Sequence, residues 1–339
     1  MIGVFTPSWP ANALLRDKYL HGIRQLESLG FRVLEGSLTR TLRHQGYRSG
    51  SPEERANEFM ALVVNPEVHC LMSAIGGNNS ASLVPFLDFE VIRAHPKIIC
   101  GYSDVTSLHL SILAYSRLST FYGPAVTPSF GQWPGVLPET HDSFLDAVQR
   151  HRIGSRVLTP PEKWSNELVF NEASGFRSYE AFQRNSGWKV LVGGIVQAPI
   201  IVANLDTLMT TAGTSYFPDL DGTVLLIEDA DVSLAQEERN LRQLQLLGVF
   251  DRIAGLIVGK PHALDKQGAP FDYEDLIMEI VGPRNYPIIA NFDCGHTVPM
   301  LTIAQLTEIR LAAKSNGPIE LTIVDPMISN REASSPVSM

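Results

Sequence analysis

Short apolar runs alternate with amphipathic stretches through the first third of the chain. The runs have the length of buried strands and lie at 2–5, 31–34, 70–75 and 98–100. Between them, residues 16–29 and 52–65 repeat apolar side chains at three- and four-residue spacing, which predicts helices. Strands that alternate with helices indicate an open, mostly parallel sheet with flanking helices.

The same alternation returns after residue 190, with predicted strands at 223–228, 253–258 and 287–290 and predicted helices at 204–211 and 233–247. In between, prolines, glycines and aromatic residues interrupt any regular period over 127–190. We therefore expect two α/β domains. The predicted parts are an N-terminal domain over 1–135, a linker and irregular aromatic-rich loop over 136–190, a smaller C-terminal domain over 191–328, and a flexible tail over 329–339.

Composition excludes some classes of protein. The 339 residues are 44% hydrophobic and 19% charged, which is ordinary for a globular protein, and the net charge of −9 argues against a nucleic-acid surface. The three cysteines, Cys70, Cys100 and Cys294, do not suggest a disulfide framework, so we expect a reducing, cytoplasmic location. The N-terminal residues do not have the pattern of a signal peptide, and no apolar run is long enough to span a membrane.

A serine stands where one predicted strand gives way to a helix. Ser103 follows the apolar run 98–100 and Gly101, and a helical pattern begins at Val105. A nucleophile elbow exposes its serine at such a junction, and the helix N-terminus offers N–H groups to a developing oxyanion. The spacing is Gly-x-Ser-Asp instead of Gly-x-Ser-x-Gly, so Ser103 or Asp104 could equally be a helix cap.

Two more strand ends carry chemically useful groups, Glu228 and His296. A serine needs a base to become a nucleophile, and the base needs an acceptor on its second ring nitrogen, which a Ser-Glu-His set would supply. Taken singly, Glu228 could be an ion-pair partner and His296 a structural loop residue.

Three other interpretations remain at this point. The Gly76-Gly77 turn and the helix start near Ser103 could bind a small anion or nucleotide without chemistry. Cys294 lies two residues before His296 and could form a thiol site. Metal-dependent hydrolysis is disfavoured because the nine histidines show no His-x-His or His-Glu-x-x-His spacing. We expect no cofactor.

Several segments resemble the LD-carboxypeptidase family of serine peptidases, peptidase family S66. They are Ser73–Ser80, Gly101–Asp104, Phe217-Pro218, Ile227–Asp229 and Asp293–Thr297. Phe121–Ala125 and Pro161–Ser165 make the likeness closest to the microcin C self-immunity branch of that family. The resemblance extends over nearly the whole chain.

The resemblance implies a catalytic triad of Ser103, Glu228 and His296. It also implies an oxyanion hole formed by the N–H groups of Gly77 and Asp104, with Gly76 and Asn78 beside the substrate. The serine would lie in the N-terminal domain, the other two members in the C-terminal domain, and the active site in a cleft between them. Proteins of this kind are metal-free homodimers that cleave an amide near a free carboxylate or in an aminoacyl-nucleotide. In the microcin branch this activity gives resistance to an antibiotic.

Two departures from the pattern concern the substrate. Asn171 occupies the position at which the microcin branch has a tryptophan that stacks on a nucleotide base. Phe170 or Trp188 could replace it, and we expect the segment 160–188 to wall the pocket. The family's Gly-Gly-Asn reads Val202-Ala203-Asn204 here, so Asn204 is retained but the glycines are not. The natural substrate therefore stays open between a murein peptide with an L,D bond, an aminoacyl-nucleotide and another peptide amide.

Overall fold

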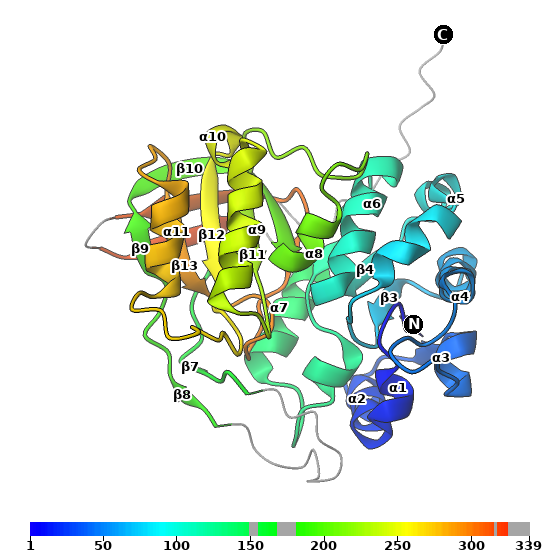
Figure 1. Ribbon diagram of the computed structural model, residues 1–339. Coiled ribbons are helices and arrows are strands. Elements are labelled where there is room, and N and C mark those ends of the chain that lie inside the picture. The colour runs from blue at the N-terminus through cyan, green and yellow to red at the C-terminus, as the bar shows by residue number, and fades with distance from the viewer. Residues whose placement is uncertain (149–154, 168–180, 315–316, 325–339) are drawn as a thin grey trace.

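The protein folds into two α/β bodies that lie side by side (Figure 1). The structure is a computed structural model, and it describes residues 1–148, 155–167, 181–314 and 317–324. The expected tail at 329–339 lies outside these residues, as do Phe170 and Asn171. No helix in the described ranges is long and apolar enough to cross a membrane.

The N-terminal body is built on a six-stranded sheet with the order β14-β5-β4-β3-β1-β2. Its strands are β1 (Ile2–Phe5), β2 (Val33–Glu35), β3 (Cys70–Ser73), β4 (Ile98–Gly101), β5 (Phe121–Tyr122) and β14 (Ile303–Ala304). The first five are parallel, and β14 pairs antiparallel with β5.

The helical segments of this half begin with α1 (Ala11–Leu14), α2 (Arg16–Ser28), α3 (Ser37–Thr41), α4 (Pro52–Val64), η1 (Ser80–Phe86) and α5 (Phe89–Ala94). They continue with η2 (Ser103–Val105), α6 (Thr106–Ser116), η3 (Val126–Phe130) and α7 (Pro138–Val148). The local sequence explains where α4 begins. Ser51 and Glu54 form a reciprocal capping box, and Pro52 occupies the first turn, where its missing N–H costs nothing.

The second body contains an eight-stranded mixed sheet with the order β6-β16-β15-β10-β11-β12-β13-β9. Its strands are β6 (Arg156–Leu158), β9 (Lys189–Val192), β10 (Gly194–Asn204), β11 (Val224–Glu228), β12 (Gly255–Gly259), β13 (Ile288–Phe292), β15 (Glu308–Ala313) and β16 (Ile319–Ile323). Its helices are α8 (Leu205–Thr210), α9 (Leu234–Leu246), α10 (Val249–Arg252) and α11 (Tyr273–Val281). The short strands β7 (Lys163–Trp164) and β8 (Gln183–Arg184) pair with each other.

The segment expected as linker and loop, 136–190, contains more regular structure than its prolines suggest. Helix α7 buries Phe144 and Ala147 in the core of the N-terminal body. Strand β6 pairs with β16 at the edge of the second sheet, and β9, which begins at Lys189, pairs with β13. The amphipathic period of α7 covers only three turns and follows a proline-rich stretch, so the pattern did not separate it from the loop.

The hydrophobic core joins the two bodies. Tyr102, Tyr122 and Ala125 of the N-terminal body belong to one buried cluster with side chains of β10, β11 and β13. Leu110 of α6 is buried in the other cluster of the C-terminal body. The carboxyl ends of β4, β11 and β13 are therefore held close together by packing across the junction.

Candidate active site

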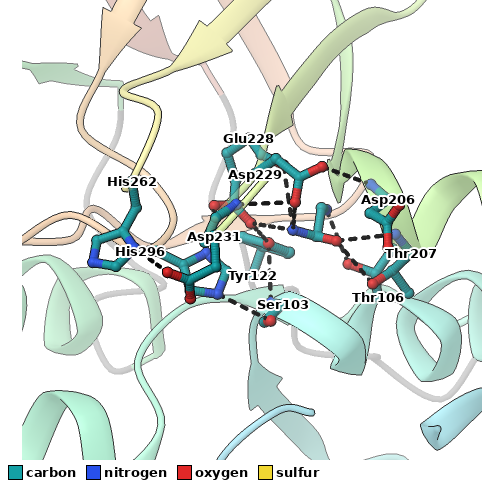
Figure 2. Close-up of polar contacts among 12 residues, drawn as sticks. Ser103, Thr106, Tyr122, Asp206, Thr207, Glu228, Asp229, Asp231, His262 and His296 are labelled. Atoms are coloured by element: carbon teal, nitrogen blue, oxygen red, sulfur yellow. Dashed lines mark hydrogen bonds and ion pairs between the residues drawn. The ribbon is translucent and has the colours of Figure 1, made fainter. Parts of the chain in front are cut away.

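Three strand ends meet at the junction of the two bodies. Ser103 follows β4, Glu228 is the last residue of β11, and His296 lies in the loop after β13. Figure 2 shows the side chains of all three pointing toward one another. His296 Nε2 lies 3.0 Å from Ser103 Oγ, and His296 Nδ1 lies 2.7 Å from Glu228 Oε2. The structure thus brings together the three residues that the sequence suggested from separate strand ends.

The backbone at Ser103 is strained. Its φ of 63° falls in the left-handed region, which a residue with a Cβ rarely adopts. Ser103 begins the short turn η2 that leads into α6, and its N–H donates to the hydroxyl of Tyr122 at 3.0 Å. This backbone conformation directs the serine hydroxyl toward the cavity and His296, as in a nucleophile elbow.

Glu228 is buried and fully engaged by hydrogen-bond donors. Tyr122 donates its hydroxyl proton to Oε1, Asn204 Nδ2 approaches Oε1 at 3.3 Å, and His296 binds Oε2. Burial by itself would raise the pKa of Glu228, but His296 and these donors hold it below the usual range. Glu228 is therefore an ionised carboxylate that can accept a hydrogen bond from the Nδ1–H of His296.

The electrostatic surroundings of His296 favour a proton on the ring. Burial opposes the charged form, but the adjacent Glu228 outweighs it and raises the pKa of His296 above its ordinary value. Asp229 and Asp231 act in the same direction. An imidazole of this kind can accept a proton from Ser103 and keep it while negative charge develops on a substrate.

The turn after β3 needs glycine at both positions. A Cβ on Gly76 would lie 2.9 Å from Ser103 Cβ, and a Cβ on Gly77 would lie 2.3 Å from Ser8 Oγ. Gly77 also has a φ of 143°. Gly76 lets the chain pass directly against Ser103, and Gly77 lets it pass against Ser8, where no side chain would fit.

Two backbone N–H groups near Ser103, those of Gly77 and Asp104, have no hydrogen-bond partner among the described residues, and Gly77 lines the cavity in front of Ser103. The carboxylate of Asp104 is used elsewhere, because its Oδ2 accepts from the N–H groups of Asn79 and Ser80 at 2.8 and 2.9 Å. The Asp104 side chain therefore fixes the turn after Gly77.

A cavity of about 440 Å³ opens in front of Ser103 and His296. The expected residues Gly76, Gly77, Asn78 and Asn204 line it. Asn204 also caps α8, since its Oδ1 accepts from Thr207 N at 3.0 Å, and its Nδ2 donates to Asp229 Oδ1 at 3.0 Å. Its side chain thus holds Asp229, which also lines the cavity.

Trp188 is not among the residues that line this cavity. Its Nε1 donates to Asp293 Oδ2 at 2.9 Å, and its ring centroid lies 4.8 Å from that of Phe292. Of the described residues in 160–188, none is among those that line the cavity. The expected aromatic wall from this segment is therefore not found in its described residues, and Phe170 and Asn171 lie outside them.

The geometry does not favour the thiol interpretation. Cys294 is buried, and burial raises the pKa of its thiol well above the ordinary value. The two ring nitrogens of His296 are directed to Glu228 and Ser103. No group of three or more His, Cys, Asp or Glu side chains that could hold a metal ion occurs in the described ranges.

Two further residues of the site, Tyr102 and Tyr122, are not indicated by the sequence pattern. The Tyr102 ring packs edge-on against the His296 ring at 4.9 Å between centroids, and Tyr102 also lines the cavity. Tyr122 is buried between Ser103 and Glu228. No local pattern marks either hydroxyl, because their positions depend on how β4 and β5 align in the sheet.

Comparison with known proteins identifies the family. Residues 2–123 match the model of the LD-carboxypeptidase N-terminal domain, and residues 197–311 match that of its C-terminal domain. The microcin C7 self-immunity protein MccF of Escherichia coli is 40% identical over 304 residues, which cover 89% of this chain and 87% of MccF. The chain belongs to the LD-carboxypeptidase family of serine peptidases.

Two further similarities concern the activities found in the LD-carboxypeptidase family. A Bacillus subtilis protein named as a probable murein peptide carboxypeptidase is 30% identical over 89% of this chain and 85% of its own. The structure of MccF in complex with aspartyl sulfamoyl adenosine superposes with a TM-score of 0.90 at 36% identity, over 97% of this chain and 96% of that one. The protein is thus a serine-type carboxypeptidase or amide hydrolase with the two-domain α/β fold of this family.

Proposed function

We propose that this protein hydrolyses an amide-type acyl bond with Ser103 as nucleophile, His296 as general base and Glu228 as the group that orients His296. One observation carries the proposal, the continuous hydrogen-bonded path from Ser103 Oγ through both ring nitrogens of His296 to the buried Glu228. Together these groups have the roles of a catalytic triad.

The chemistry proceeds in two halves. Ser103 Oγ attacks the acyl carbon while its proton passes to His296 Nε2, and the N–H groups of Gly77 and Asp104 bind the resulting oxyanion. The proton then moves from Nε2 to the leaving nitrogen, and the acyl–nitrogen bond breaks to leave an ester on Ser103. A water molecule gives its proton to Nε2, attacks the ester, and restores Ser103 when the second tetrahedral intermediate collapses.

For the substrate, we propose an aminoacyl- or peptidyl-nucleotide. MccF has been solved with aspartyl sulfamoyl adenosine, and the likeness to it extends over nearly all of this chain. An activity of this kind would protect a cell from an antibiotic that carries an aminoacyl-nucleotide. The second candidate is an L,D-linked murein peptide, which the similarity to the Bacillus subtilis relative supports.

Product analysis separates these candidates. We expect the protein to convert aspartyl sulfamoyl adenosine to aspartate and sulfamoyl adenosine, detected by mass spectrometry, faster than it releases D-alanine from a murein tetrapeptide. The reverse order of kcat/KM would assign it to murein peptides. If the protein hydrolyses neither of the two compounds, the proposal is contradicted.

Substitutions test the triad itself. Ser103→Ala should lower kcat at least about 1,000-fold, and adding His296→Ala should cost little more, because triad members act as a unit. Cys294→Ala is the control and should retain most activity. A Ser103→Ala protein that keeps more than about a tenth of the activity would overturn the assignment.

We also propose that the protein is a homodimer, as the family resemblance implies. Light scattering of the purified protein measures this directly.

A further inference from the structure

We propose that Tyr122 is a positioning residue whose hydroxyl links the backbone N–H of Ser103 to the carboxylate of Glu228 through two hydrogen bonds. This inference rests on the proposed function, because it assigns Tyr122 a role in the same reaction. It concerns a residue that contacts neither Ser103 Oγ nor the cavity.

The backbone of Tyr122 is fixed on both sides. Tyr122 ends β5, where it pairs with Gly101 of β4 on one side and with Ile303 of β14 on the other. Its side chain is completely buried in the core cluster that spans the two bodies. The hydroxyl oxygen therefore has a defined position relative to Ser103, which follows β4 (Figure 2).

The hydroxyl uses both of its hydrogen-bonding capacities within the site. Its oxygen accepts a hydrogen bond from the Ser103 N–H at 3.0 Å, and its O–H donates a hydrogen bond to Glu228 Oε1. Burial, followed by the neighbouring Glu228, raises the pKa of Tyr122 far above its ordinary value, so the hydroxyl keeps its proton. Since Glu228 is ionised and can only accept, the proton must point at Oε1 and a lone pair is left for Ser103 N–H.

These bonds close a ring that begins and ends at Ser103. The order is Ser103 N–H, Tyr122 hydroxyl, Glu228 carboxylate, His296 ring and Ser103 Oγ. The backbone of Ser103 has a strained φ, which persists only where the surroundings hold it. The hydrogen bond from Ser103 N–H to Tyr122 stabilises this backbone conformation, and the hydrogen bond from Tyr122 to Glu228 fixes the rotamer of Glu228. The same hydroxyl therefore positions both the nucleophile and the carboxylate of the triad.

The experiment removes only the hydroxyl. Tyr122→Phe keeps the ring in the core and deletes both bonds. Tyr19→Phe is the matched control, because Tyr19 is also fully buried in the N-terminal body and donates to a glutamate, Glu35, at 2.9 Å. Hydrolysis of aspartyl sulfamoyl adenosine, or of the murein tetrapeptide if that is the better substrate, is followed from pH 5 to pH 9 for both variants.

We expect Tyr122→Phe to lower kcat by about 10- to 100-fold per folded molecule, with KM within about threefold of wild type. Loss of the donor leaves more charge on Glu228 for His296, so the acidic limb of the pH–rate profile should move to higher pH. A purely structural role would lower the melting temperature and leave the pH profile in place. Tyr19→Phe should change none of the kinetic values.

Wild-type kcat and an unshifted acidic limb in Tyr122→Phe would overturn the inference. A fall in activity that only follows the fraction of folded protein would overturn it as well. Failure of the proposed function is recognised by a different result. If the Ser103→Ala protein stays active, the triad assignment is wrong, whatever the behaviour of Tyr122→Phe.

Discussion

His296 lies among carboxylates, and its charge balance sets the working pH of the site. As a general base it must start without a proton, while Glu228, Asp229 and Asp231 raise its pKa above the ordinary value of about 6.5. Activity should therefore decline as the pH falls through a midpoint above about 6.5. The pH dependence of kcat/KM measures this midpoint in the free enzyme.

Glu228→Gln tests the cause of that shift. Without the carboxylate, the midpoint should move to lower pH and kcat should fall by about three to four orders of magnitude, because an amide no longer fixes the productive tautomer of His296. An unchanged midpoint in Glu228→Gln would show that another group sets the pKa of His296. NMR titration of the His296 ring gives the same pKa without substrate.

The residue types at the ends of predicted strands were sufficient to suggest the three triad residues. Ser103, Glu228 and His296 stand out because each ends or follows an apolar run, and the fold brings those ends together. The sequence suggests Trp188 as a replacement for the stacking tryptophan that is missing at Asn171. The sequence does not show that Asp293 is the partner of its indole, because that contact joins residues 105 positions apart.

At the scale of elements, the turn between β3 and η1 decides how near the chain comes to the nucleophile. In Gly76→Ala the new Cβ would lie 2.9 Å from Ser103 Cβ and 3.1 Å from Ser103 Oγ, so the serine must shift. We expect kcat to fall more than about tenfold, with a stability loss of about 1–3 kcal/mol as for other overpacked sites. Enzyme kinetics and urea denaturation measure the two effects separately.

Gly213→Ala is the control for replacing a glycine at a site where the new Cβ overlaps nothing. Gly213 has a φ of 84° and open space around its Cβ position, so the substitution should cost about 1 kcal/mol and leave kcat unchanged. If both variants kept full activity, the close approach of Gly76 to Ser103 would have no part in catalysis.

The limits of the sequence pattern are clearest for short or cross-connected elements. Strands β3, β4 and β11 follow directly from their apolar runs, whereas β14 contains two residues and has no period to detect. Although β14 belongs to the C-terminal half of the chain, it pairs with β5 of the N-terminal sheet. Because register between distant segments places the Tyr122 hydroxyl, no local pattern could have predicted it.

At the scale of the whole molecule, the two bodies share their cores. Tyr102 and Tyr122 pack into a cluster with the C-terminal sheet, and Leu110 of α6 is buried in the other C-terminal cluster. Strand β14 adds a backbone connection in the opposite direction. Separate domains often unfold independently, but a common core couples their stabilities.

We therefore expect one cooperative unfolding transition, with hydrogen exchange of β3 and β12 amides reporting the same free energy. Leu110→Ala tests the coupling, because it creates a cavity at a junction between the bodies and should destabilise by about 2–5 kcal/mol. Protection should fall equally in β3 and β12. A loss confined to one of these strands would mean that the bodies unfold separately, and the triad would then depend on a junction weaker than either core.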